Sequence, residues 1–264
     1  MMNGILWALA GTLFTFSVTA LGALNVFWIK KEVSSVLQCA FLGFAGGVMI
    51  AASVWSLLLP GIERAEELNQ ISCLVMTGGF ILGVIALLAA DCVFKKHYMR
   101  SLASGKINSL KQRTLMLVAA ITIHNIPEGM SIGLAFALAA SEPGNTALFS
   151  GAMALALGIG IQNYPEGTAV ALPLLKDGMS KKKAALYGSM SASVEPIFGV
   201  LAALLATAIT PLMPLLLAFA AGTMIYVVVQ ELLPEAHIGQ GDKTATLGFI
   251  AGFLIMMILD VSLG

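Results

Sequence analysis

Eight long apolar runs, separated by short polar segments, divide this chain of 264 residues. A helix that crosses the hydrocarbon core of a bilayer needs about 20 apolar residues, and within lipid only helices and closed barrels satisfy the backbone. The runs are unbroken and show no alternation of apolar and polar residues, which favours helices over a barrel. We therefore predict transmembrane helices over residues 4–29, 33–60, 71–93, 114–140, 147–175, 184–209, 211–234 and 245–263.

The scarcity of charged residues excludes the soluble classes of protein. Hydrophobic residues make up 58% of the chain and charged residues 11%, whereas soluble domains carry about 25% charged residues. Because 14 basic residues balance 14 acidic ones, no positive excess is available to neutralise phosphates, and we expect no nucleic-acid partner. The sequence predicts an all-α polytopic membrane protein in which residues 1–264 form a single transmembrane domain surrounded by the lipid bilayer.

The distribution of basic residues predicts the orientation, because short cytoplasmic loops carry an excess of Lys and Arg. All but one of the basic residues lie in odd-numbered connections between the predicted helices, namely Lys30, Lys31, Lys95, Lys96, Arg100, Lys106, Lys111, Arg113, Lys176, Lys181, Lys182, Lys183 and Lys243. The exception is Arg64. This segregation predicts that both termini lie outside and that residues 94–113 form a basic cytoplasmic loop.

Glycines four residues apart recur in the apolar runs, a spacing that lets helix backbones approach closely in lipid. The pairs are Gly43 and Gly47, Gly79 and Gly83, Gly129 and Gly133, and Gly248 and Gly252. We interpret them as contact seams between helices, without a chemical role.

A weaker signal concerns internal symmetry. The second predicted helix ends in Leu-Leu-Leu-Pro at Pro60, and the seventh ends in Glu-Leu-Leu-Pro at Pro234. With the predicted orientation these two helices run in opposite senses, as inverted repeats of helices one to three and six to eight would require, a common plan in carriers. Chance resemblance between leucine-rich segments is the alternative.

Three glutamates lie well inside predicted helices four, five and six, namely Glu128, Glu166 and Glu195. An ionisable side chain at that depth costs at least about 2.5 kcal/mol on insertion scales, and it indicates function by default. A polar contact between helices would explain one such residue. For three of them, with no Lys or Arg at the same depth, the sequence predicts neutralisation by a cation that is not a side chain.

Two similar hexads surround the first two glutamates, HNIPEG at residues 124–129 and QNYPEG at residues 162–167. Residues four apart share a helix face, so His124 lies on the face of Glu128 and Gln162 on the face of Glu166. The proline of each hexad bends its helix and frees a carbonyl oxygen. Nitrogen and oxygen ligands without thiolate suit Zn²⁺, Fe²⁺, Mn²⁺ or Co²⁺. We predict an exchangeable site for a divalent metal, and no prosthetic group.

The paired hexads, together with Ser-Val-Glu-Pro at residues 193–196, resemble the ZIP (Zrt/Irt-like) family of metal transporters, and in particular its GufA-type prokaryotic branch. The resemblance covers the whole chain. It implies eight transmembrane helices in a 3+2+3 arrangement, a homodimer in a prokaryotic inner membrane, and transport of metal toward the cytoplasm by an elevator-like sliding of part of the bundle.

The resemblance also implies a two-metal site. The first ion would be bound by His124, Glu128, Gln162 and Glu166. The second would be bound or lined by Asn125, Glu128, Asn163, Glu166 and Glu195, with Glu128 and Glu166 bridging. Many relatives have His in place of Gln162, and some have Asp in place of Asn163, so this chain offers fewer strong ligands. Zinc is the expected cargo, with iron, manganese, cobalt and cadmium as further candidates.

Four polar residues near the inner end of the seventh helix match positions along the metal exit route in relatives, although a solvated helix end is an equal explanation. They are Gln230, Glu231, Glu235 and His237.

Two other classes of protein remain as alternatives. A metal-selective channel would use the same ligands as a carrier, so the sequence does not separate the two. An intramembrane metalloprotease would need the motif HExxH, but Asn125 follows His124 and no second histidine lies nearby. Because no GxSxG elbow or Walker loop is present either, we predict that the chain is not an enzyme.

Overall fold

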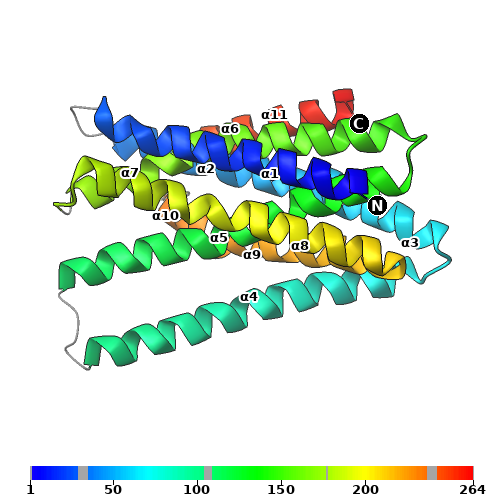
Figure 1. The fold of residues 1–264 in the computed structure, drawn as a ribbon, viewed down its shortest axis with the longest axis horizontal. Coiled ribbons are helices and arrows are strands. Elements are labelled where there is room, and N and C mark those ends of the chain that lie inside the picture. Colours follow the sequence, from blue (N-terminus) through cyan, green and yellow to red (C-terminus); the bar gives the residue numbers. More distant parts are fainter. Residues whose placement is uncertain (1, 29–34, 104–108, 177, 237–242, 264) are drawn as a thin grey trace.

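The computed structural model describes residues 2–28, 35–103, 109–176, 178–236 and 243–263, and all regular structure in these residues is helical (Figure 1). In the first half of the chain the elements are α1 (Met2–Ala23), η1 (Leu24–Phe27), α2 (Ser35–Ala52), η2 (Ser53–Leu58), α3 (Leu59–Glu67), α4 (Ser72–Ala103) and α5 (Ser109–Ser141). In the second half they are α6 (Thr146–Lys176), α7 (Lys181–Met190), η3 (Ser191–Ser193), α8 (Val194–Ala208), η4 (Thr210–Leu212), α9 (Met213–Val227), η5 (Val228–Leu232), α10 (Leu233–Glu235) and α11 (Thr244–Leu263).

The helices form one elongated bundle, and both ends of the chain lie at the same end of it (Figure 1). Within the described residues, 7 stretches of helix are long and apolar enough to cross a membrane. The chain is thus an all-helical, multi-pass membrane protein. The remaining predicted span corresponds to α5, a helix of 33 residues that is not among the 7, so the count of eight spans stays a prediction.

The basic segment at residues 94–113 differs from the predicted loop. Helix α4 continues to Ala103 and α5 begins at Ser109, so most of the segment is helical. The stretch after Val93 contains Lys, Met, Arg, Leu and Ala, which favour helix, and no Gly or Pro. The apolar run marks where lipid ends, whereas the helix continues beyond it.

Glycine seams join the helices in pairs, α2 with α11, α4 with α9, α5 with α8 and α1 with α6. A Cβ at Gly47 would lie 2.0 Å from the carbonyl oxygen of Phe249, and one at Gly83 would lie 2.2 Å from that of Phe219. Because such distances leave no room for a side chain, the prediction that the paired glycines are contact seams is confirmed.

Two short π-helical turns occur at matching places in the chain. The turn η2 directly precedes Leu59 and Pro60, and η5 directly precedes Leu233 and Pro234. A π turn inserts one extra residue into a helix and re-aims the side chains around it, and such turns are frequent at functional sites. Each of the two turns carries a polar side chain that contacts another helix, as described below.

Adjacent glycines on α4 allow a direct test of the seam. We expect Gly79→Ala to destabilise the protein by about 1–3 kcal/mol, the usual cost of overpacking, because its Cβ would lie 2.5 Å from the carbonyl oxygen of Leu215. We expect Gly78→Ala to be neutral or stabilising, because no described atom lies within 4 Å of its Cβ and alanine favours helix. Thermal unfolding in detergent measures both variants, and equal melting temperatures would contradict the assignment.

Candidate metal centre

The first hexad places an imidazole and a carboxylate one above the other on the buried face of α5. His124 and Glu128 are separated by one helical turn, and His124 Nε2 lies 3.7 Å from Glu128 Oε1. Their exposed fractions are 5% and 0%. The helix continues through Pro127 without a break, so the pair is held on a regular helix inside the bundle.

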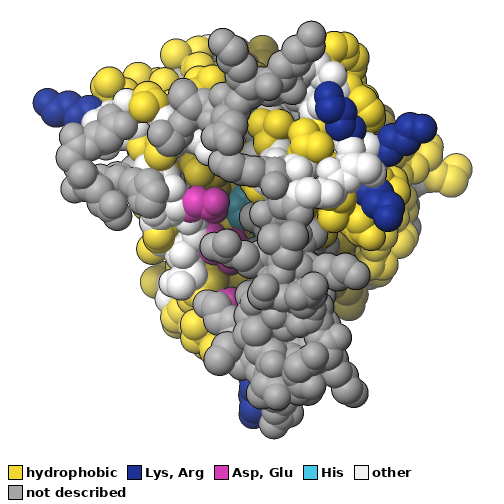
Figure 2. Space-filling view, turned by 90° about the vertical axis from the view of Figure 1, so that its left-hand side faces the viewer, with side chains coloured by type: hydrophobic (Ala, Val, Ile, Leu, Met, Phe, Trp, Pro, Cys, Tyr) yellow, Lys and Arg dark blue, Asp and Glu magenta, His cyan; other side chains and the backbone are white. Residues whose placement is uncertain are grey.

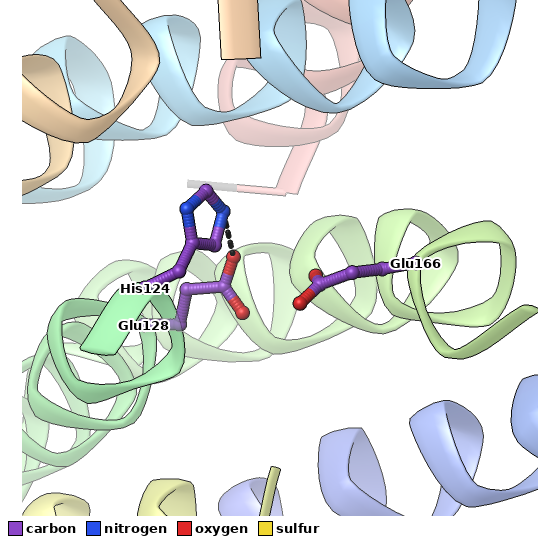
Figure 3. Close-up of side chains that lie close together, drawn as sticks. All are labelled: His124, Glu128 and Glu166. Carbon is purple, nitrogen blue, oxygen red and sulfur yellow. Dashed lines mark ion pairs between the residues drawn. The ribbon is translucent and has the colours of Figure 1, made fainter. Parts of the chain in front are cut away.

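The second hexad brings Glu166 of α6 to the same point. One ligand atom from each of His124, Glu128 and Glu166 lies within 4.8 Å of the other two, and the Glu128 and Glu166 carboxylates face each other across the space between α5 and α6 (Figure 3). Ligand atoms lie about 2.0–2.2 Å from a bound zinc ion, so small side-chain rotations would bring all three onto one cation. Within the described residues this is the only such cluster of His, Cys, Asp and Glu.

Gln162, one turn before Glu166, links the two hexads. Its Nε2 donates a hydrogen bond to Glu128 Oε1 over 2.5 Å, and the side chain is fully buried. The carbonyl oxygen Oε1 of Gln162 has no hydrogen-bond partner among the described residues. The amide nitrogen therefore donates to a carboxylate, while the amide oxygen accepts no hydrogen bond. That oxygen is available as a ligand for a cation.

Glu195 and Asn163 form a second polar group beside the first. Glu195 lies in the first turn of α8 and is fully buried. Asn163 Nδ2 donates to Glu195 Oε1 over 3.0 Å, and the hydroxyl of Thr15 on α1 donates to Glu195 Oε2. Helices α1, α6 and α8 thus meet at this carboxylate.

The centre holds more electron-pair donors than its own side chains satisfy. Oxygen atoms without a hydrogen-bond partner in the described part of the chain include Glu128 Oε2, Glu166 Oε1, Gln162 Oε1 and Asn163 Oδ1. The buried amide of Asn125, the residue after His124, lacks a partner at both its oxygen and its nitrogen. No described Lys or Arg lies within ion-pair distance of Glu128, Glu166 or Glu195. Buried carboxylates and amide oxygens without a partner are costly, and this set of oxygen atoms could hold a cation.

The glycine that ends each hexad explains how the helices come so close. A Cβ at Gly129 would lie 2.4 Å from the carbonyl oxygen of Glu195, and one at Gly167 would lie 2.0 Å from that of Thr19. The first contact presses α5 against α8, and the second presses α6 against α1. Each glycine therefore lets a second backbone approach.

The four candidate exit residues differ in burial and in their contacts. Glu231 lies in the π turn η5, and its Oε2 is 3.9 Å from His124 Nδ1. Gln230 and Glu235 are exposed, and His237 lies outside the described residues. Glu231 is therefore the one for which the structure gives a contact with the centre, among the three described members of this set.

The centre lies below an opening at one end of the bundle. Figure 2 looks onto the end where α5 and α7 begin, and shows acidic side chains and a histidine in a hollow near the middle of this face, with basic side chains at its outer edge. The side chain of Glu231 is 33% exposed, against 6% for that of His124. Glu231 is thus the more exposed partner of the buried imidazole.

Near the other end of the bundle, a second polar pair borders a cavity of about 310 Å³ lined by α3, α5, α6 and α11. Asp260 near the end of α11 is buried, and its Oδ1 accepts a hydrogen bond of 2.7 Å from Ser56 of the π turn η2. The two π turns thus present polar side chains near opposite ends of the bundle.

Sequence reasoning missed Thr15. The sequence does carry a sign that this residue is buried. Thr12, Thr15 and Thr19 are spaced so that they fall on one face of the first apolar run, together with Gly11 and Gly22. All three threonines are fully buried. A helix face of small and polar residues in an apolar run predicts contact with other helices, although it does not reveal which residue would be contacted.

Comparisons with known proteins identify relatives of the whole chain. The family model described as "ZIP Zinc transporter" matches residues 100–260. The zinc transporter ZIP11 of Xenopus tropicalis is 37% identical, with 98% of each chain covered. The zinc transporter GufA of Myxococcus xanthus is 34% identical over 97% of this chain and 98% of its own. The zinc transporter ZIPB of Bordetella bronchiseptica is 36% identical over 98% of this chain and 82% of its own.

Proposed function

We propose a metal site and a transport route for this chain, starting from the fact that it belongs to the ZIP family of zinc transporters, GufA-type members included. It is accordingly a transporter of divalent transition metals. The observation that carries the site is the cluster of His124, Glu128 and Glu166, whose ligand atoms lie within 4.8 Å of one another in a bundle that provides no described basic side chain to neutralise them.

The first ion is bound by the imidazole of His124, the carboxylates of Glu128 and Glu166, and the carbonyl oxygen of Gln162. The free Gln162 Oε1 supports this set, because its amide nitrogen already donates to Glu128. The second ion is bound or lined by the residues toward α8, with Glu128 and Glu166 bridging. Its residues are Asn125, Glu128, Asn163, Glu166 and Glu195.

The ligand types favour zinc as the cargo. One imidazole nitrogen with carboxylate and amide oxygens suits Zn²⁺, and it also accommodates Fe²⁺, Mn²⁺, Co²⁺ and Cd²⁺. No thiolate lies in the cluster, which disfavours Cu⁺. Amide oxygens are weak ligands, so the ion exchanges readily, as a transporter requires.

The direction of transport is toward the basic end of the bundle. Under the positive-inside rule the end that carries Lys181, Lys182 and Lys183 faces the cytoplasm, and the chain termini at the opposite end face outward. The hollow below which the centre lies opens at the basic end (Figure 2), and Glu231 marks the exit. This orientation fits a prokaryotic inner membrane.

The helix pairs support inverted repeats within a single transmembrane domain over residues 1–264. Exchange the first three spans, α1, α2 and α4, with the last three, α8, α9 and α11, in that order, and exchange α5 with α6. The contacting pair α2 and α11 then maps onto the contacting pair α9 and α4. The same exchange maps α5 and α8 onto α6 and α1. The two π turns also correspond. This pattern favours eight helices in a 3+2+3 arrangement. The family resemblance adds an elevator-like sliding of part of the bundle and a homodimer.

Uptake into liposomes tests this proposal. We expect Glu166→Ala and His124→Ala to lower saturable Zn²⁺ uptake by at least about ten-fold, because each variant loses a metal ligand. The panel includes Fe²⁺, Mn²⁺, Co²⁺ and Cd²⁺. Glu67→Ala is the control, since Glu67 is half exposed and pairs with Arg64 far from the centre.

The outcomes separate the alternatives. Unchanged flux in both ligand variants would overturn the site. Flux that rises linearly with metal concentration, without saturation, would identify a channel that uses the same ligands. Hydrolysis of a membrane peptide that depends on Glu128 would identify an intramembrane metalloenzyme, although the matched relatives bear the names of transporters.

A further inference from the structure

Three fully buried threonines line one face of α1, and they use their hydroxyl groups differently. Thr12 donates to the carbonyl oxygen of Ala8 over 2.7 Å, and Thr19 donates to that of Thr15 over 3.2 Å. Such bonds within a helix are the ordinary way in which a buried hydroxyl is satisfied. Among the three, Thr15 reaches a side chain on another helix, the carboxylate of Glu195.

The Thr15 hydroxyl has two acceptors within reach but only one proton. The carbonyl oxygen of Thr12 lies 3.1 Å from Thr15 Oγ1, whereas Glu195 Oε2 is nearer. A hydrogen bond to a carboxylate is about twice as strong as one between neutral groups. The hydroxyl therefore donates to Glu195, and α1 contributes a donor to the metal centre.

Thr15 and Asn163 together fix the Glu195 carboxylate, with one donor on each oxygen. The bond from Asn163 also fixes the amide of Asn163 itself. Because its nitrogen donates to Glu195, its carbonyl oxygen is turned away from Glu195, and that oxygen has no partner among the described residues. The Gln162 amide shows the same arrangement against Glu128.

We infer that Thr15 is a positioning residue for the second metal position: it anchors the Glu195 carboxylate, which in turn presents the carbonyl oxygen of Asn163 as a ligand. The inference rests on the proposed function of this site. Thr15 contacts no ion itself. It acts as the partners of ligands do in other metal sites, by holding a group in the orientation from which it binds.

The close packing of α1 leaves little freedom in this arrangement. Gly22 and Gly167 bring α1 and α6 into backbone contact, and a Cβ at Gly22 would lie 2.0 Å from the carbonyl oxygen of Tyr164. Gly199 of α8 meets Thr12, whose Cγ2 would lie 2.6 Å from a Cβ there. Since α1 is tightly packed against both helices that carry Asn163 and Glu195, the Thr15 hydroxyl is held in place.

The test compares variants of matched shape in purified full-length protein. Thr15→Val keeps the branched shape and removes the hydroxyl, Thr15→Ser keeps the hydroxyl, and Thr12→Val removes a hydroxyl that serves only its own helix. Dissociation constants for Zn²⁺ are measured by chelator competition, together with Glu195→Gln and the double variant Thr15→Val/Glu195→Gln. Glu166→Ala reports on the cluster independently.

We expect Thr15→Val to weaken the more weakly bound Zn²⁺ equivalent by about ten-fold, the usual effect of removing the partner of a ligand. The Zn²⁺ dissociation constants of Thr15→Ser and Thr12→Val should remain within about two-fold of wild type. In the double variant, Thr15→Val should cause no further loss of affinity beyond that of Glu195→Gln, because both substitutions act through one carboxylate. Three results would overturn the inference. Thr15→Val could bind Zn²⁺ as wild type does, or Thr15→Val and Thr12→Val could lose equal affinity. The third is a double variant in which the losses of affinity from the two substitutions multiply.

The two levels of proposal fail in different ways. If Glu166→Ala abolishes Zn²⁺ binding while Thr15→Val binds normally, the metal site stands and the positioning role is wrong. If neither Glu166→Ala nor Thr15→Val changes Zn²⁺ binding, the proposed site is wrong and the role of Thr15 falls with it.

Discussion

Glu128→Gln is expected to abolish saturable metal uptake, with Zn²⁺ affinity lowered by more than ~100-fold, because loss of a ligand exceeds the 10–100-fold effect of losing a ligand's partner. Glu128 lies in contact with side chains from both hexads. Its Oε1 accepts from Gln162 and faces His124, and its Oε2 has no partner among the described residues. Glutamine keeps the shape but replaces a charged oxygen with an amide group.

The same variant should not unfold the protein. A buried carboxylate beside two others is costly in the absence of a cation, and its neutral isostere removes that cost. We therefore expect the melting temperature of metal-free Glu128→Gln to equal or exceed that of wild type, while the increase in melting temperature on adding Zn²⁺ disappears. Fluorescence-monitored unfolding in detergent, with and without Zn²⁺, measures both effects.

The matched control for this prediction is Glu142→Gln, directly after the end of the same helix. Glu142 Oε1 pairs with Arg64 at 3.0 Å near the opposite end of the bundle, so the substitution makes the same chemical change away from the centre. Uptake by Glu142→Gln should resemble wild type. Normal uptake by Glu128→Gln would contradict the central role given to this carboxylate.

The hexads could be predicted from the sequence because their chemistry is local. His124 and Glu128 are one helical turn apart, so any helix through them places both on one face. Three intramembrane glutamates without basic partners then predict a cation where the helices meet. The structure adds that Glu166 joins this pair within one cluster, whereas Glu195 lies against Asn163 and Thr15 instead.

Helix ends beyond the bilayer were less predictable. Hydropathy reports where lipid ends, so the predicted third span stopped at Val93. The helix α4 itself continues to Ala103, because its backbone bonds are satisfied internally in water as in lipid. The end of an apolar run and the end of a helix are therefore different positions. They coincide only where a helix-breaking residue such as Gly or Pro lies at the membrane interface.

Contacts between distant helices were not predictable from residue type and spacing. The face of α1 that carries Thr15 could be recognised as buried, but its partner depends on how α1 is rotated against α8. The approach of Glu231 to His124 depends in addition on the π turn η5, which changes the phase of the helix. A helical wheel drawn with a regular period does not contain that change.

Gln162→His is expected to raise the preference for Zn²⁺ over Mn²⁺ by about ten-fold, since imidazole suits zinc and Mn²⁺ prefers oxygen ligands. Gln162 is fully buried beside Glu128 and Glu166, so a histidine there adds a second nitrogen opposite His124. The substitution also removes the 2.5 Å hydrogen bond to Glu128 Oε1, which frees that oxygen for the ion. Competition between the two metals in binding and in uptake measures the ratio.

Two variants separate the added nitrogen from the lost amide. Gln162→Met removes the oxygen ligand and the hydrogen bond without adding a nitrogen, so both metals should bind more weakly. Gln70→His adds a histidine near the outer end, where Gln70 donates to the carbonyl oxygen of Pro211, and should change neither affinity. If Gln162→His weakens Zn²⁺ and Mn²⁺ equally, as Gln162→Met should, the added imidazole nitrogen does not reach the ion and the prediction is wrong. If Gln162→Met binds both metals as wild type does, the amide oxygen is not a ligand. A gain for Zn²⁺ alone would instead show that this position contacts the ion and that glutamine keeps the site weak enough to release its cargo.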